Sequence, residues 1–245
     1  MSALVERVRR MALFERLKAA ESTRAATAWF RFQTGLHYVT RGHWVRRRAV
    51  ARYLASTAEP RLQIGAGPNR LEGWLDSDVV SGEIHLALNR RLPIDDSIFS
   101  YVFGEHVIEH LSEASGIDLL SELHRVLRPG GVVRLVTPDL GKLVAIYEDR
   151  NPGVDRETYV RYIDEITGRR RERPGQVFNA LMRSWGHRYI YDEDDLTAKL
   201  RQAGFHDIAV RDPGESPHGT LRGLEHHGPE WGNRAEAICI EATAR

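Results

Sequence analysis

The sequence predicts an α/β fold in which a parallel sheet is connected by crossover helices. From Arg61 onward, short apolar runs alternate with turns and with segments of helical periodicity, and this alternation is typical of parallel sheets with helical crossovers. The first apolar run leads into Gly65-Ala66-Gly67, and a second run ends on Asp78. Glycine amides beside a strand-end carboxylate are typical of a nucleotide-type cofactor site.

Composition indicates a soluble globular protein. The apolar fraction is 42% and the charged fraction is 28%, which are ordinary values for such proteins. The one cysteine, Cys239, excludes an internal disulfide framework and is typical of a reducing compartment. No apolar run approaches the roughly 18 residues of a spanning helix, and Glu6, Arg7, Arg9 and Arg10 interrupt any signal-peptide core. We therefore expect a cytoplasmic protein.

The 245 residues exceed one typical domain, so we expect an N-terminal extension over residues 1–57 and an α/β domain over residues 58–245. The first 52 residues hold twelve Lys or Arg against three Glu, whereas the remainder holds 23 basic and 31 acidic residues. Helical periodicity predicts three helices in the extension, at residues 2–20, 22–34 and 42–55.

The sequence leaves several roles open for this basic helical arm. It can dock on the acidic body of its own chain, cover the cofactor cleft, form a homodimer contact or lie on an anionic membrane surface. Nucleic-acid binding is not expected, because no recognisable nucleic-acid module accompanies the arginines.

Five strands and one helix are expected between residues 61 and 136. The apolar runs predict strands over residues 61–64, 74–80, 83–88, 98–103 and 131–136. Leucines at helical spacing predict a helix over residues 115–127, which the Pro-Gly-Gly run at residues 129–131 should stop.

The connection between the first two strands is too short for a full helix. Only ten residues separate Gly67 from Asp78, and the second strand must begin near Trp74. We therefore expect a loop or one helical turn in place of the first crossover helix. This spacing excludes a dinucleotide site in which a pyrophosphate lies at a helix N-terminus.

Residues 142–190 are expected to form a helical insertion after the fifth strand. Helical patterns lie near residues 142–150, 154–167 and 176–185, and an insertion at this point lies over the carboxyl edge of the sheet, where α/β folds bind ligands. We expect it to act as a substrate cap, although its arginine-rich linker at residues 168–175 can equally be a flexible solvated loop. The chain then closes with one helix and two strands, over residues 192–204, 205–210 and 237–243.

Six stretches in this order resemble the class I S-adenosylmethionine-dependent methyltransferases, in particular the family-11-type branch. They are spread over residues 60–243 and read Leu62-Gln-Ile-Gly-Ala-Gly67, Gly73-Trp-Leu-Asp-Ser-Asp78, Leu92-Pro-Ile-Asp-Asp-Ser-Ile-Phe99, Glu105-His-Val-Ile-Glu-His-Leu111, Glu122-Leu-His-Arg-Val-Leu-Arg-Pro-Gly-Gly131 and Gly186-His-Arg-Tyr-Ile-Tyr-Asp192. The resemblance implies a Rossmann-like, seven-stranded, mainly parallel sheet whose last strand is antiparallel. It also implies S-adenosylmethionine as the cofactor.

The resemblance further implies which residues contact the cofactor. The glycine turn, made of Gly65, Ala66, Gly67 and Pro68, lies against the methionine portion of the cofactor. Asp78 binds the ribose hydroxyls, and Leu88 and Asn89 flank adenine. Glu105 and His106 lie near the sulfonium and the acceptor.

Three positions depart from the usual pattern of that family. Gln63 stands where an acidic residue usually precedes the glycine motif, and Ala87 stands where relatives often carry Asp. Ser100 replaces the Asp that usually follows the aromatic residue of the fourth strand. These departures leave open a methyltransferase-like module that binds the cofactor without turnover.

Methyl transfer from a sulfonium is an in-line displacement, in which positioning can supply about 7–11 kcal/mol of the barrier. A hydroxyl acceptor must also lose a proton, which a nearby His or carboxylate can accept. His106 is the first candidate base because it lies at a strand end beside the expected cofactor, His187 is the second, and Asp139 is the third. Relatives with such a Gly-Trp second strand and Glu-His-Val-x-Glu-His segment often act in glycan or lipid-linked sugar pathways. The resemblance therefore implies O-methylation of a sugar or another small-molecule hydroxyl.

A second motif overlaps the first candidate base. His106-Val-Ile-Glu109-His110 matches the H-x-x-E-H pattern of inverted zinc peptidases, in which both histidines project from one helix face onto zinc. Gly104 and a strand precede the motif, which places His106 at a strand end. We therefore predict no metal site and keep a zinc peptidase as the third alternative. The histidines of the loop at residues 212–234 are expected at the surface.

Overall fold

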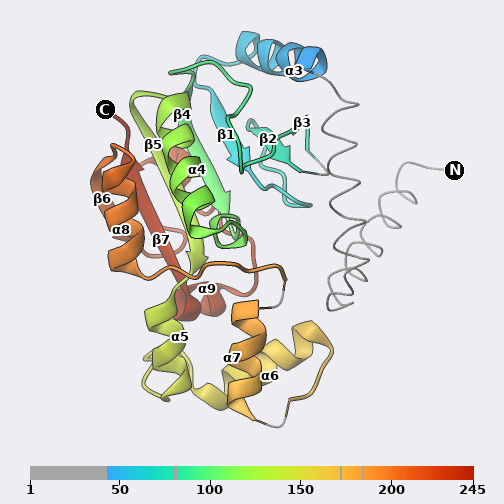
Figure 1. The fold of residues 1–245 in the computed structure, drawn as a ribbon, viewed down its shortest axis with the longest axis vertical. Coiled ribbons are helices and arrows are strands. Elements are labelled where there is room, and N and C mark those ends of the chain that lie inside the picture. Colours follow the sequence, from blue (N-terminus) through green and yellow to red (C-terminus); the bar gives the residue numbers. More distant parts are fainter. Residues whose placement is uncertain (1–42, 80–81, 172, 184) are drawn as a thin grey trace, which may run out of the picture.

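The computed structural model describes residues 43–245 except residues 80–81, 172 and 184 (Figure 1). The helices expected at residues 2–20 and 22–34 lie outside the described residues. The third expected helix is present as α3, His43–Ala55. None of the described helices is long and apolar enough to span a membrane.

A seven-stranded sheet with strand order β3-β2-β1-β4-β5-β7-β6 forms the centre of the fold (Figure 1). The pairs from β3 to β5 are parallel, and β7 runs antiparallel to both of its neighbours. The strands are β1 Arg61–Ile64, β2 Leu75–Asp78, β3 Ile84–His85, β4 Phe99–Glu105, β5 Leu127–Pro138, β6 His206–Arg211 and β7 Ala237–Thr243. The predicted Rossmann-like, mainly parallel sheet with an antiparallel last strand is confirmed.

The short first crossover is also confirmed. Residues 65–74 connect β1 to β2 without a helix, although the two strands pair in parallel. Two turns keep the connection compact: Asn69 N donates to Ala66 O (2.9 Å), and Trp74 N donates to Leu71 O (3.3 Å). The chain thus returns to the start of β2 in a loop rather than along a helix.

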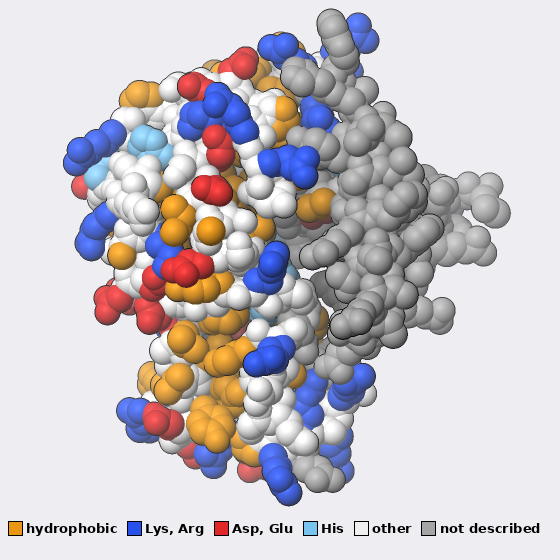
Figure 2. All heavy atoms as spheres, viewed as in Figure 1, with side chains coloured by type: hydrophobic (Ala, Val, Ile, Leu, Met, Phe, Trp, Pro, Cys, Tyr) orange, Lys and Arg blue, Asp and Glu red, His pale blue; other side chains and the backbone are white. Residues whose placement is uncertain are grey.

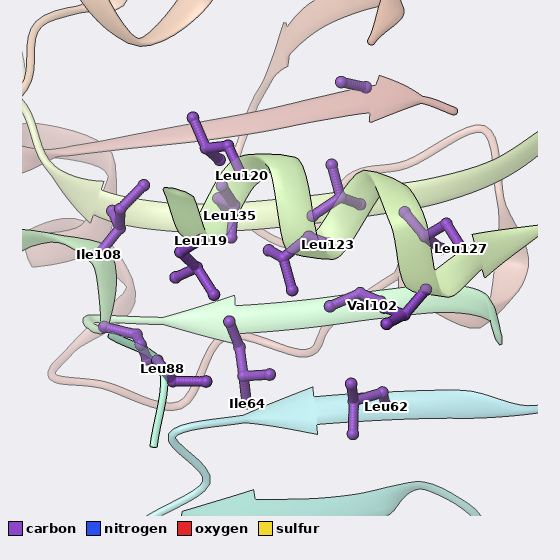
Figure 3. Close-up of a cluster of buried hydrophobic side chains, with 14 of the residues drawn as sticks. Leu62, Ile64, Leu88, Val102, Ile108, Leu119, Leu120, Leu123, Leu127 and Leu135 are labelled. Atoms are coloured by element: carbon purple, nitrogen blue, oxygen red, sulfur yellow. The ribbon is translucent and has the colours of Figure 1, made fainter. Parts of the chain in front are cut away.

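Helices α4 (Glu113–Val126) and α8 (Glu193–Gln202) lie together over one face of the sheet (Figure 1). The Ser112 Oγ caps α4 by accepting a hydrogen bond from Ser115 N (3.3 Å). Figure 3 shows Leu119 and Leu123 of α4 directed toward the strands, where they join the main apolar core with Val102 and other strand residues. Burial of this leucine face anchors the sheet at its centre.

The bounds of several elements differ from the sequence prediction. The strand expected over residues 83–88 is only Ile84–His85, and the largest other differences are at α4 and β5. The helix expected over residues 115–127 begins two residues earlier, because Ser112 provides an N-cap. The Pro-Gly-Gly run at residues 129–131 does not stop the helix but lies inside β5, which begins at Leu127. Extended backbone is favoured for the residue before proline, so the chain is already in a strand conformation when it reaches the glycines. In addition, the loop at residues 212–234 includes η2 (Gly219–Leu221) and the start of α9 (Glu230–Glu236), which the sequence did not indicate.

The helical insertion after β5 is present as α5 (Leu140–Tyr147), α6 (Arg156–Thr167) and α7 (Pro174–Arg183). These helices form a lobe beyond the carboxyl edge of the sheet (Figure 1). The lobe has its own apolar core, which includes Leu143, Ile146, Tyr159 and Val177. Figure 2 shows apolar side chains gathered over the same lobe.

A buried ion network ties the loop after β6 to the sheet. The guanidinium of Arg134 on β5 is fully buried and donates to Glu225 Oε1 (2.7 Å) and Glu241 Oε1 (2.6 Å). It also donates to the carbonyl of Glu215 (2.9 Å). Because Glu215 and Glu225 belong to the loop and Glu241 belongs to β7, one arginine holds the loop against two strands.

Arg134→Met should lower the free energy of unfolding by about 3–5 kcal/mol, because it leaves buried carboxylates without their cation. The measurement is urea denaturation of the full chain at neutral pH. Arg161→Met is the matched control: Arg161 pairs with Glu157 across one exposed helix face (3.4 Å), and such pairs contribute about 0–1 kcal/mol. Equal losses in the two variants would contradict this account of the network.

Candidate active site

The turn after β1 is shaped by two glycines with left-handed backbone. Gly65 has φ of 61° and Gly67 has φ of 51°. A Cβ added at Gly65 would lie 2.3 Å from Val107 Cγ2, so a side chain there has no room. A Cβ at Gly67 would meet nothing within 4 Å. The turn therefore packs tightly against the loop after β4 on one side and is open on the other, as a backbone cradle for a ligand requires.

Asp78 and Gln63 both bind this turn. Gly67 N donates to Asp78 Oδ2 (3.2 Å), which brings the acid at the end of β2 beside the glycine amides. The buried Gln63 amide donates to Asn69 O (2.7 Å) and accepts from Leu71 N (3.1 Å). An amide can donate and accept at once, whereas a carboxylate can only accept. Gln63, which the sequence marked as a departure, therefore holds the short crossover in place.

The other expected cofactor residues differ in accessibility. Ala66 and Leu88 are buried, and Leu88 packs in the main apolar core (Figure 3). Pro68 and Asn89 are exposed, while Ala87 is half-buried. At this edge the side chain of Asn89 is therefore better placed to contact a ligand than the buried side chain of Leu88.

Ser100 lies away from this edge. It is the second residue of β4 and is buried, and its amide donates to Pro60 O (2.7 Å). Glu105 ends the same strand five residues later, about 16 Å along an extended chain. The departure at Ser100 therefore does not alter the glycine turn or the strand end.

The carboxylate of Glu105 binds the loop after β6, which Arg134 holds against the sheet. Its carboxylate accepts hydrogen bonds from His226 N (3.1 Å) and His227 N (3.0 Å). Burial raises the pKa of the Glu105 carboxyl, and the two backbone amides oppose that rise. The sequence assigned His226 and His227 to a surface loop without a fixed position, because nothing local indicates that their amides meet the end of β4.

His106 and Glu109 form a buried pair directly after β4. The His106 backbone is left-handed (φ 52°), and its Nδ1 lies 3.0 Å from Glu109 Oε1. Its Nε2 is buried without a hydrogen-bond partner among the described residues, and its ring lies 4.1 Å from the ring of His227. Because Nδ1 faces a carboxylate it carries the proton, so Nε2 of the neutral ring has the lone pair.

The electrostatics of this pair are set by burial and by mutual attraction. Burial lowers the pKa of His106, but the hydrogen bond and charge of Glu109 outweigh it, so the pKa is raised. Burial likewise acts to raise the pKa of Glu109, whereas the bond and charge of His106 hold it well below its usual range. The pair therefore favours a charged carboxylate that orients the imidazole.

Glu109 also joins three segments of the chain. Its Oε2 accepts a hydrogen bond from Thr137 Oγ1 on β5 (3.0 Å). Its backbone carbonyl accepts from Arg188 N (2.8 Å) and Tyr189 N (3.2 Å), which follow the helical lobe. No local sequence pattern indicates this role, because the H-x-x-E-H pattern marks Glu109 only as an acid beside two histidines.

The second and third candidate bases have other partners. His187 Nδ1 lies 2.6 Å from Leu181 O, and burial lowers the pKa of this histidine. Asp139 caps α5 by accepting from Gly141 N (2.8 Å) and Lys142 N (3.2 Å). Burial raises the pKa of Asp139, and these two amides oppose that rise. The Asp139 carboxylate is thus engaged as a helix cap.

The arrangement required by the inverted zinc peptidase motif is not formed. His106 follows β4 directly, and residues 108–110 make only one turn of 3₁₀ helix, η1. His106 and His110 therefore do not project from one face of a helix. The peptidase alternative is wrong for this backbone.

Comparison with known proteins assigns the central segment of the chain. Residues 62–135 match the family model described as a methyltransferase domain. This segment is similar to a methyltransferase domain. Two curated relatives, from two strains of Staphylococcus epidermidis, are each named demethylmenaquinone methyltransferase and are 34% identical to this chain over 128 residues. The matching part is 49% of this chain and 46% of each relative, so the chain spans about half the length of the curated relatives.

Solved structures that are similar to the chain have low sequence identity to it. One is a methyltransferase from Thermotoga maritima, described as a possible histamine N-methyltransferase, with a TM-score of 0.45 and 13% sequence identity. The aligned part covers 83% of this chain and 91% of that chain. Another is a methyltransferase from Archaeoglobus fulgidus, with a TM-score of 0.42 and 14% sequence identity. The aligned part covers 88% of this chain and 99% of that chain. These likenesses are weak, so the fold is defined by the strand order itself.

Gly65→Ala tests the close packing of the glycine turn after β1. We expect a loss of about 2–4 kcal/mol in the free energy of unfolding, from overpacking against Val107 and from left-handed backbone. Gly67→Ala has a similar φ but open space, so it should lose only about 1–2 kcal/mol. Urea denaturation measures both.

Adding Val107→Ala should recover part of the loss in Gly65→Ala, because it removes the methyl group that clashes with the new Cβ. Strictly additive effects of the two substitutions would contradict the contact.

Proposed function

We propose that the protein is an S-adenosylmethionine-dependent methyltransferase that methylates a hydroxyl group of a small molecule. The observation that carries this proposal is the match of residues 62–135 to a methyltransferase domain. The matched segment contains the open glycine turn, Asp78 and the pair of His106 with Glu109, which lie at the carboxyl ends of three neighbouring strands. In open α/β sheets, this edge is where ligands bind.

The residues of this edge fit the cofactor. Residues 65–68 would lie against the methionine portion, and Asp78 would accept hydrogen bonds from the ribose hydroxyls. Leu88 and Asn89 would flank adenine, and Glu105 would lie near the sulfonium. When bound, S-adenosylmethionine supplies an activated methyl group for in-line displacement. The short first crossover supports a ligand of this kind, because it offers no helix N-terminus for a pyrophosphate.

His106 is the proposed general base, and Glu109 is its positioning residue. The lone pair of His106 Nε2 would take the proton of the acceptor hydroxyl while Nδ1 keeps its hydrogen bond to Glu109. His187 is the second candidate base, and Asp139 is a weaker third because its carboxylate caps α5. A module that binds the cofactor without turnover is the alternative.

The acceptor is proposed from resemblance alone. The Gly-Trp second strand and the Glu-His-Val-x-Glu-His segment support a sugar or a lipid-linked glycan, with the helical insertion at residues 142–190 as its cap. Demethylmenaquinone, which would be methylated at a ring carbon and not at a hydroxyl, is the alternative acceptor, because the curated relatives carry that name. Exposed Arg47, Arg48 and Arg52 on α3 support a peripheral contact with an anionic membrane, and a homodimer contact is another of the roles open to the N-terminal arm. A cytoplasmic location stays part of the proposal.

Asp78→Ala should weaken the binding of S-adenosylmethionine and S-adenosylhomocysteine by about 10- to 100-fold, because hydrogen bonds to a charged group contribute about 1.5–3 kcal/mol. Isothermal titration calorimetry measures both ligands. Asp95→Ala is the matched control, since Asp95 is an exposed turn residue, and its Kd should equal that of the wild type. If the wild type binds neither ligand, both the enzyme and the binding-module proposals are wrong.

His106→Gln should lower kcat by about 10²- to 10⁴-fold and leave the Kd for S-adenosylmethionine near the wild-type value. The assay is S-adenosylhomocysteine release with a panel of sugar, lipid-linked glycan and demethylmenaquinone acceptors. His206→Gln, on the outer strand β6, is the control and should keep full turnover. Full turnover in His106→Gln would exclude His106 as the base.

A further inference from the structure

We infer that Glu109, His110 and His187 form a binding site for a divalent transition-metal ion beside the proposed base. One ligand atom from each of the three side chains lies within 4.8 Å of the others. Metal–ligand bonds of about 2.1 Å place neighbouring ligand atoms a little over 3 Å apart, so a bound ion would draw the side chains somewhat closer. Glu109 is buried, and the two histidines are partly exposed, so an open side remains toward solvent.

The two histidines come together only in the folded chain. His110 ends η1, and His187 follows the helical lobe, yet their ring centroids are 5.0 Å apart. The backbone bonds from Arg188 N and Tyr189 N to Glu109 O join these two segments. The ligands are thus brought into position by main-chain contacts that do not depend on a metal.

The hydrogen bond of His187 leaves its Nε2 atom available to bind a metal ion. Its Nδ1 lies 2.6 Å from the Leu181 carbonyl, so Nδ1 must carry the proton and Nε2 keeps its lone pair. Metal-binding histidines commonly donate their second ring nitrogen to a backbone carbonyl in this way. The bond also fixes the orientation of the ring.

Glu109 has the capacity to bind an ion without losing its present partners. An ionised carboxylate offers about four lone-pair positions. His106 Nδ1 uses one position on Oε1, and Thr137 Oγ1 uses one on Oε2. Each oxygen retains a further lone pair. His106 and Thr137 would then be the outer hydrogen-bond partners that orient a ligating carboxylate.

The donor set determines the class of ion. Two imidazole nitrogens and one carboxylate oxygen favour zinc or another first-row transition metal, whereas magnesium and calcium prefer oxygen ligands. Three protein ligands also leave a coordination position open, as in sites that bind water or substrate. This site differs from the H-x-x-E-H pattern, since His106 is not a ligand and His187 is.

The test is calorimetric titration of zinc chloride into the full chain, prepared without a polyhistidine tag and dialysed against EDTA. The wild type should bind one equivalent of zinc. His110→Gln and His187→Gln should each weaken this binding by more than about 100-fold, beyond the 10- to 100-fold losses that follow the removal of an outer-shell partner. His206→Gln, at the far edge of the sheet, should bind as the wild type does. Circular dichroism verifies that each variant is folded.

Absence of stoichiometric zinc binding by the wild type overturns the inference, as does unchanged binding in both ligand variants. The titration contains no S-adenosylmethionine and measures no turnover. Its outcome is therefore separate from that of the proposed methyltransferase activity.

Discussion

The arrangement of the candidate site depends on one buried carboxylate, that of Glu109. A charged group in the interior is costly unless hydrogen bonds satisfy it. Glu109 meets this condition by accepting from His106 Nδ1 and Thr137 Oγ1, while its own carbonyl accepts from Arg188 N and Tyr189 N. The end of β4, strand β5 and the segment after the helical lobe are thereby held around one residue. The proposed base and the proposed metal ligands are both positioned by these bonds.

A second buried network positions the other side of the site. Arg134 binds Glu225 and Glu241, and so holds the loop after β6 against β5 and β7. The same loop then places the amides of His226 and His227 on the carboxylate of Glu105. The ring of His227 lies against His106. An arginine in the sheet interior therefore affects the surroundings of the proposed base without contacting it.

Local patterns predicted most of the sheet. The strands are short apolar runs bounded by turns, and the brief interval between Gly67 and Asp78 excluded a first crossover helix by length alone. These local patterns were less reliable where a turn or helix-stop signal in the sequence competes with strand pairing. The Pro-Gly-Gly run at residues 129–131 was predicted to end a helix, yet it lies inside β5. Gln63 departs from the family pattern, yet its amide satisfies two backbone groups of the short crossover.

The sequence by itself determined the sheet, the glycine turn with Asp78 beside it, and the position of His106 at a strand end, because these depend on residues close together in the chain. Only the tertiary structure decided which distant groups meet there. His187 lies next to His110, and the amide of His226 meets Glu105, through the folding of long connections that no local periodicity encodes. Their partners are selected by the need to satisfy buried polar groups, and that requirement arises only when the chain is folded.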